Sequence, residues 1–196
     1  MKVIGITGGV GSGKSRVLEF LETEFSAVIC QADHVAWKLQ EPGQVCYREI
    51  AQCFGTDILN ADETINRSAL GAIVFADRER LNALNRIMHP AVKEYICKWI
   101  KEEANKGTTY FFIEAALLLE ENYQEICDEV WYIYSHEDVR SKRLMENRAY
   151  SEEKIKAIME TQLKDSDFRK QCDVVIDNSG DFESTCVQIR HRMSKI

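Results

Sequence analysis

A phosphate-binding loop near the N-terminus constrains the fold of this chain more than any other feature. Residues 8–15 read Gly-Gly-Val-Gly-Ser-Gly-Lys-Ser and match the pattern G-x-x-x-x-G-K-[ST]. Glycines let backbone N–H groups approach a polyphosphate, and the helix that follows presents its positively polarised end to the same anion. A β-branched run at residues 2–6 precedes the loop, and apolar residues recur at helical spacing over residues 17–25. The order strand, loop, helix predicts a binding site for a nucleoside triphosphate.

Individual loop residues have predictable roles. Lys14 is expected to contact the β- and γ-phosphates, and Ser15 is expected to bind Mg²⁺. The remaining predicted ATP contacts in this stretch are Gly9, Gly11, Ser12, Gly13 and Arg16. The alternative for Arg16 is a side chain that only faces solvent.

Composition narrows the function classes. The 196 residues suffice for one substantial core, so one domain with insertions is expected. A net charge of −7 argues against a protein that binds nucleic-acid duplexes, whereas a small anionic ligand needs only local positive charge. The seven cysteines are scattered and odd in number, which favours reduced thiols over a zinc site or disulfides. With no signal peptide or membrane-length apolar run, we expect a cytoplasmic enzyme.

Four further segments have the composition of short buried strands. They are residues 27–30, 110–113, 130–134 and 174–178. Helical patterns separate them, so the sequence predicts a three-layer α/β fold with a five-stranded parallel sheet.

The stretch between the second and third predicted strands is mainly helical. An apolar stripe over residues 81–88 is expected to end at His89-Pro90, because proline disfavours helix for the residue before it, and another helix is expected over residues 92–100. Residues 58–59 and 64–65 are expected to form a small hairpin or loop. His89 is a candidate ligand contact, with a capping or core histidine as the alternative.

Two acidic residues follow predicted strands. Asp33 lies just past the second strand, where open α/β sheets place their ligands, although an N-cap of the next helix is the alternative. Glu114 ends the deeply apolar third strand and is expected to support the water shell of the metal, with a solvated surface glutamate as the alternative.

A basic segment lies between the last two predicted strands. Residues 140–170 contain nine Lys or Arg against six acids, in an otherwise acidic chain. A helical pair of this charge could close over the triphosphate as a lid, whereas a solvated charged face is the alternative for most of its residues. Arg143 and Arg148 are the candidates for phosphate contact, and Arg140 is the third.

From Ile4 to about Gly180 the chain resembles the dephospho-coenzyme A kinases. The motifs that carry the resemblance follow in order: residues 7–15, Ala32-Asp33, residues 41–43, His89-Pro90, residues 117–120, Gln162 and residues 175–180. Beyond the first motif, none of them is specific alone, but their order and spacing together are.

The resemblance implies a reaction and a division of the chain. It implies transfer of the γ-phosphoryl of ATP to the ribose 3′-hydroxyl of dephospho-CoA with Mg²⁺, the final step of coenzyme A biosynthesis, on an adenylate-kinase-like core. The core would comprise about residues 1–33, 108–139 and 170–196, with an acceptor-binding region at about 34–107 and a lid at about 140–169. We expect a monomer or small homo-oligomer that binds neither nucleic acid nor membrane.

The resemblance also implies roles for single residues. Asp33 would orient or deprotonate the acceptor hydroxyl, Thr7 and His89 would belong to the acceptor site, and Asn178 would lie near the adenine. Several positions depart from the family pattern. Asp is common in the family at the positions of Gln31 and Glu114, Thr at the position of Arg16, and Pro at the position of Ala116. An arginine of the lid is expected at the position of Asn147, and this chain has Arg148 beside it.

Two other functions remain open at this point. One is another small-acceptor kinase, acting on a nucleoside, a nucleotide or a shikimate-like alcohol, because the loop reads only phosphate. The other is a nucleotide-dependent switch, which should carry D-x-x-G followed by N-K-x-D. Residues 105–108 read Asn-Lys-Gly-Thr and lack the Asp, and the chain keeps Lys14 and Asp33, so the switch is less favoured.

Overall fold

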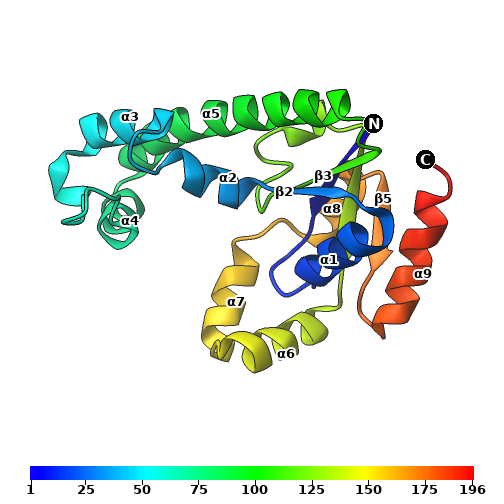
Figure 1. The fold of residues 1–196 in the computed structure, drawn as a ribbon. Helices are drawn as coiled ribbons and strands as arrows, with labels where there is room; N and C mark the ends of the chain where they lie inside the picture. The colour runs from blue at the N-terminus through cyan, green and yellow to red at the C-terminus, as the bar shows by residue number, and fades with distance from the viewer. The chain divides into compact units, whose positions relative to one another are not determined.

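Five strands form a single sheet in the protein, for which a computed structural model describes all 196 residues (Figure 1). Its strands are β1 (Lys2–Thr7), β2 (Val28–Gln31), β3 (Tyr110–Glu114), β4 (Glu129–Tyr134) and β5 (Val174–Asp177). They lie in the order β2-β3-β1-β4-β5, and the pairings of β1 with β3, β1 with β4 and β4 with β5 are parallel. The predicted five-stranded parallel α/β fold is confirmed.

Nine α-helices and two short 3₁₀ helices accompany the strands, and all but the last α-helix lie between strands. The α-helices are α1 (Lys14–Phe25), α2 (Ala32–Leu39), α3 (Val45–Phe54), α4 (Arg67–Ala76), α5 (Arg78–Asn105), α6 (Glu137–Arg148), α7 (Glu152–Glu160), α8 (Asp165–Gln171) and α9 (Phe182–Met193). The 3₁₀ helices are η1 (Thr56–Ile58) and η2 (Tyr123–Ile126), and an isolated antiparallel bridge pairs Leu59 with Ile65. None of the helices combines the length and the apolar composition that crossing a bilayer requires.

The alternation of side chains along β4 shows how the layers are built. Trp131 and Ile133 are fully buried in a core cluster that also contains apolar residues of α1 and α9. Tyr132 points to the other face, where its ring stacks on Phe168 of α8 with centroids 4.5 Å apart. Helices therefore cover both faces of the sheet, as parallel strands require.

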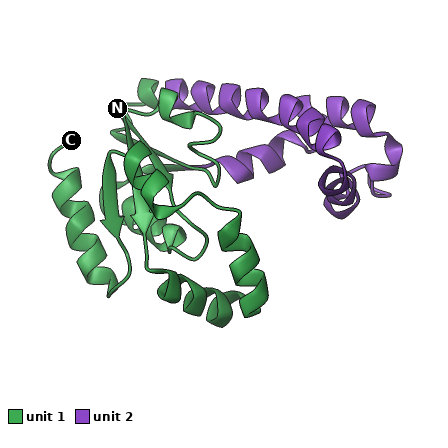
Figure 2. Cartoon of the chain, turned by 180° about the vertical axis from the view of Figure 1, so that it is seen from behind, with its two compact units in different colours: residues 1–29, 103–196 green, residues 30–102 purple.

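The chain divides into two compact units (Figure 2). Unit 1 comprises residues 1–29 and 103–196, and unit 2 is the continuous segment 30–102. Unit 1 carries the phosphate-binding loop, most of the sheet and helices α1 and α6 to α9. Unit 2 is helical and contains α2, α3, α4 and most of α5.

Helix α5 corrects one expectation from the sequence. The predicted end at His89-Pro90 is wrong, because α5 runs through Pro90 for 28 residues. An interior proline costs about 3 kcal/mol relative to alanine, since it removes a hydrogen bond and crowds the preceding turn. Met88, Val92 and Ile96 are buried at four-residue spacing on both sides of Pro90. Burial contributes about 1.5–3 kcal/mol for each such side chain, so keeping their face aligned outweighs the cost of the proline.

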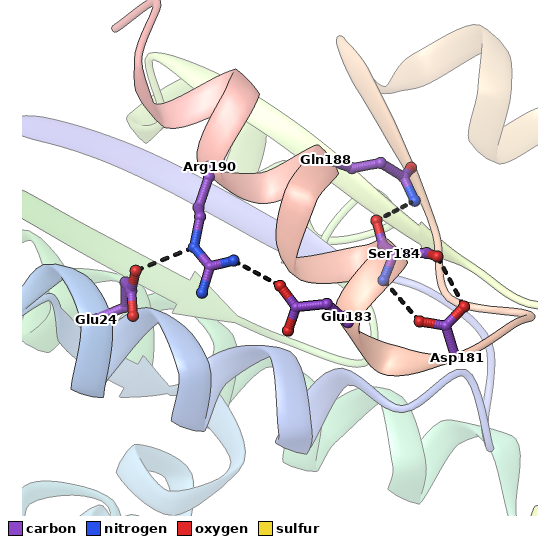
Figure 3. Close-up of polar contacts among 6 residues, drawn as sticks. All are labelled: Glu24, Asp181, Glu183, Ser184, Gln188 and Arg190. Atoms are coloured by element: carbon purple, nitrogen blue, oxygen red, sulfur yellow. Dashed lines mark hydrogen bonds and ion pairs between the residues drawn. The ribbon is translucent and has the colours of Figure 1, made fainter.

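Polar contacts fix the start of α9 and join it to α1 (Figure 3). The Asp181 carboxylate caps the helix by accepting hydrogen bonds from the Ser184 backbone N–H at 2.9 Å and the Ser184 hydroxyl at 2.7 Å. Arg190 bridges Glu24 of α1 at 3.0 Å and Glu183 at 2.8 Å. Since these ion pairs are exposed to solvent, they contribute little to stability, and the apolar face of α9 supplies most of the attachment.

Candidate active site

The phosphate-binding loop connects the end of β1 to the start of α1. Its lysine, Lys14, is the first residue of α1, and the ammonium group donates a hydrogen bond to the Gly8 carbonyl at 2.7 Å. The same ammonium lies 3.9 Å from a carboxylate oxygen of Glu114, the last residue of β3. Because β1 and β3 are parallel neighbours, the lysine and the acid predicted for the site meet at the carboxyl edge of the sheet.

Gly13 gives the loop its final bend. Its φ of +87° lies in the left-handed region, and a Cβ atom there would lie 2.3 Å from the side-chain nitrogen of Asn178. That nitrogen donates to the Ser12 carbonyl at 2.7 Å, and the Asn178 side-chain oxygen accepts from the Thr185 hydroxyl at 3.0 Å. Asn178, predicted to lie near the adenine, is 3 % exposed and has both ends of its amide bound to the protein.

A Gly13→Ala substitution tests this arrangement. We expect a loss of about 2–4 kcal/mol in the free energy of unfolding, from left-handed strain and displacement of the Asn178 amide, and a weaker affinity for ATP. Chemical denaturation and calorimetric titration with ATP measure the two effects. Gly71→Ala in α4 is the control, since its nearest neighbour would be 3.7 Å away and alanine favours helix. Equal stability of Gly13→Ala and the wild type would contradict the interpretation.

Arg143 provides a second support beneath the loop. Its guanidinium donates to the Asn178 carbonyl at 2.8 Å and to the Ser135 hydroxyl at 3.1 Å, and it lies 3.4 Å from the Ser12 carbonyl. Burial, and secondarily the nearby Arg16 charge, lower the pKa of the Arg143 guanidinium. The predicted lid arginine therefore binds the backbone of the loop in this structure.

Sequence reasoning missed two members of this network. Ser135 is buried, and its hydroxyl, which has one proton to donate, lies 2.8 Å from the Asn178 carbonyl and 3.1 Å from the Ser12 carbonyl. Thr185 is fully buried and binds Asn178 as described above. Ser135 directly follows β4, so the rule that pointed to Asp33, a polar residue after a strand, could have identified it. Thr185 lies within α9 and gave no comparable signal.

The other predicted loop residues differ in exposure. Ser15 and Arg16 are exposed in the first turn of α1, and the Arg16 guanidinium lies 3.9 Å above the Phe182 ring, so this side chain does more than face solvent. Thr7 and Ser12 are each 1 % exposed, and neither hydroxyl has a hydrogen-bond partner. Two buried hydroxyls without partners, one in this loop and one directly before it, fit a site that acquires polar partners from a ligand.

The residues present fit Mg²⁺ in the manner of kinases. No group of three or more His, Cys, Asp or Glu side chains could hold a metal ion by itself. Kinase sites bind Mg²⁺ through one or two protein oxygens together with substrate phosphates and water. The Ser15 hydroxyl at the start of α1 would offer such an oxygen, and the Glu114 carboxylate at the end of β3 would accept hydrogen bonds from water of the coordination shell.

Asp33 and His89 belong to unit 2. Asp33 is exposed and lies in the first turn of α2, directly after β2, but the N-cap residue of α2 is Gln31. The alternative role of Asp33 as N-cap is therefore wrong. His89 is half-buried in the interior of α5, away from both ends of that helix. In unit 1, Arg148 is exposed in the last turn of α6.

Comparison with known proteins decides which kinase family this loop and sheet represent. A family model described as dephospho-CoA kinase matches residues 2–184. The chain belongs to the dephospho-CoA kinase family. It has the activity of that family, the ATP-dependent final step of coenzyme A biosynthesis.

Individual relatives agree with this assignment. A dephospho-CoA kinase from Carboxydothermus hydrogenoformans is 40% identical over 96% of this chain and 91% of its own length. The structure of the dephospho-CoA kinase from Campylobacter jejuni superimposes with a TM-score of 0.74 at 26% identity and covers 100% of this chain and 98% of that one. Shikimate kinase from Acinetobacter baumannii shares the fold, with a TM-score of 0.57 at 12% identity over 100% of this chain and 94% of that one.

Proposed function

We propose that residues 8–15 bind the triphosphate of Mg-ATP and that its γ-phosphoryl is transferred to the ribose 3′-hydroxyl of dephospho-CoA. The observation that carries this proposal is the placement of Lys14 beside Glu114 at the carboxyl edge of the sheet, in a chain of this family. A loop of this kind binds phosphate in any nucleotide kinase and does not identify the acceptor. Our assignment of dephospho-CoA as the acceptor therefore rests on family membership.

At the donor side, we assign the backbone of Gly9, Gly11 and Gly13 to the phosphates. The Lys14 ammonium would then move from the Gly8 carbonyl toward the β- and γ-phosphate oxygens. Ser15 would bind Mg²⁺, and Glu114 would hold water of its coordination shell. When bound, Mg²⁺ neutralises charge that develops on the β- and γ-phosphate oxygens. Ser12 and Arg16 would complete the contacts with ATP, and Asn178 would act by holding the Ser12 carbonyl.

At the acceptor side, we assign the proton transfer to Asp33. Its carboxylate would accept the proton of the 3′-hydroxyl while the hydroxyl oxygen forms a bond to the γ-phosphorus. The bond from that phosphorus to the bridging oxygen breaks, and ADP leaves. Thr7 and His89 would position the acceptor, and the helical region of residues 34–107 would supply most of its binding surface.

Residues 140–169 would act as the lid, with Arg148 as the exposed arginine available to the transferred phosphoryl and Arg143 as a support of the loop.

We expect Arg148→Ala to lower kcat about tenfold or more with little change in ATP affinity, because the charge would matter mainly in the transition state. Arg143→Ala should lower both kcat and the affinity for ATP. Steady-state kinetics paired with ATP titration separate the two patterns, and unchanged kinetics in both variants would contradict the lid proposal. Lys142→Ala is the control, since that exposed side chain pairs only weakly, at 3.9 Å, with Glu146.

ADP formation with a panel of acceptors tests the proposed function. The purified chain is incubated with Mg-ATP and, separately, dephospho-CoA, AMP, adenosine, shikimate or no acceptor. We expect turnover that depends on dephospho-CoA and a product phosphorylated at the ribose 3′ position. Turnover with a different acceptor would retain the loop assignment and overturn the acceptor, whereas ATP binding without turnover on any acceptor would favour a switch.

The seven cysteines of the chain all carry free thiols. Burial raises the pKa of Cys30 and, with nearby acids, of Cys127 and Cys172 to about 12, so these thiols are unreactive near neutral pH. Free thiols and the use of ATP support our proposal of a cytoplasmic enzyme, and we propose that it acts as a monomer or small homo-oligomer.

A further inference from the structure

Side chains from outside the phosphate-binding loop hold both backbone groups of one loop residue. The Val10 carbonyl accepts a hydrogen bond from Nε of Arg140 at 2.8 Å. The Val10 N–H donates to Oε1 of Gln162 at 3.0 Å, and Nη2 of Arg140 donates to the same oxygen at 3.0 Å. These three bonds form a closed ring, which we call the Val10 clamp and define as Val10, Arg140 and Gln162.

The guanidinium of Arg140 is fixed tightly in this ring. Arg140 lies in α6, and a Cβ atom on Gly9 would be 2.4 Å from its Nη2. Gly9 therefore allows the guanidinium to lie directly against the loop backbone. Burial lowers the pKa of Arg140, as expected for a guanidinium taken out of water, although Tyr132 and Glu137 partly oppose that shift. Arg140 is thus a structural partner of the loop in this structure, whereas the sequence suggested it as a phosphate contact.

The clamp acts on the two peptide groups that flank the Cα atom of Val10. A phosphate-binding loop works only if its remaining N–H groups point inward together, which is a matter of loop shape. Gln162 lies just after α7, so the loop is tied to both helices of the α6–α7 segment. We propose that Arg140 and Gln162 are positioning residues, which hold the loop in its ATP-binding shape without contacting the nucleotide. The proposal rests on the proposed function in one respect, that this loop binds ATP.

The chemistry of the clamp distinguishes this role from a direct contact. Both bonds of Gln162 use Oε1 as acceptor, and the amide Nε2 takes part in neither. Glutamate retains an acceptor oxygen at this place and gains attraction to Arg140, whereas methionine keeps the length of the side chain and loses the acceptor. If Gln162 instead touched a phosphate through its amide N–H, glutamate would be the worse replacement, because it would place a negative charge against the triphosphate.

The experiment compares Gln162→Met, Gln162→Glu and Arg140→Lys with the wild type. We expect Gln162→Met to raise the Kd and the KM for ATP about tenfold, as loss of two hydrogen bonds in a preorganised site allows, and Gln162→Glu to stay within about threefold of the wild type. Arg140→Lys should resemble Gln162→Met, because one ammonium cannot reproduce the fork of Nε and Nη2. The KM for dephospho-CoA at saturating ATP should not change. Gln171→Met on α8 is the matched control, since that glutamine is exposed and binds only a carbonyl of its own helix.

Each outcome of this comparison either supports or overturns the positioning role of Arg140 and Gln162. An ATP affinity of Gln162→Glu as poor as that of Gln162→Met would overturn the positioning role in favour of a direct contact. Wild-type affinity in Gln162→Met and Arg140→Lys alike would show that the clamp is dispensable. Thermal unfolding identifies a variant that fails to fold, and Arg140→Lys then carries the test in place of Gln162→Met. Turnover of dephospho-CoA by the wild type in the same assays separates failure of the clamp from failure of the proposed function.

Discussion

Replacement of Lys14 by methionine is expected to reduce kcat/KM for ATP by about 10²–10³-fold. The ammonium is the one cation that the loop itself contributes, and it lies between the Gly8 carbonyl and the Glu114 carboxylate at the carboxyl edge of the sheet. Methionine keeps most of the length of the side chain and removes the charge that would stabilise the β- and γ-phosphate oxygens during transfer. ADP release at saturating dephospho-CoA, with ATP varied, measures the effect.

Lys142→Met provides the control for this substitution. Lys142 is exposed on α6 and pairs with Glu146 at 3.9 Å, an arrangement that contributes little to stability or function. We expect wild-type kinetics from this variant. A Lys14→Met enzyme that retained more than about a tenth of the wild-type kcat/KM would remove Lys14 from the assigned role.

Asp33→Asn should lower kcat by about 10²–10⁴-fold while the Kd for ATP stays at its wild-type value. The reason is chemical: the amide of asparagine occupies the same volume but cannot take the proton of the acceptor hydroxyl. Asp33 is exposed, and the N-cap position of α2 belongs to Gln31, so stability should change little. Single-turnover measurements with preformed enzyme and ATP give the rate of the transfer step directly.

Asp57→Asn is the matched control for Asp33→Asn, because Asp57 is an exposed aspartate in the short helix η1 of the same unit. We expect its transfer rate to equal that of the wild type. If Asp33→Asn transferred the phosphoryl group at a near wild-type rate, another group, or water, would have to accept the proton. If the variant instead lost ATP binding, Asp33 would act at the donor side.

The sheet was predictable because its strands are short, apolar and separated by helical patterns, so each could be located without knowing its partners. The loop was predictable because its glycines and lysine are consecutive in sequence. By contrast, three of the bonds beneath the loop join residues far apart in sequence: Arg143 and Ser135 bind the Asn178 carbonyl from 35 and 43 positions away, and Asn178 binds the Ser12 carbonyl from 166 positions away. A pattern along the chain does not specify such partners. The helix through Pro90 was missed for a related reason, since the burial that outweighs a local preference is a property of the folded protein.

The order of the strands in the sheet also affects how this chain must fold during synthesis. Strand β1 is synthesised before the other strands of the sheet, yet its register partners begin at Tyr110 in β3 and Glu129 in β4. At about 5–20 residues per second, β1 remains without a partner for about 5–20 s after it is made. All of unit 2 is translated within that interval, and it is continuous in sequence. The nascent chain can therefore form its helical insertion while the strand that leads into the phosphate-binding loop is still unpaired, and during that time the apolar strand is accessible to chaperones or to aggregation.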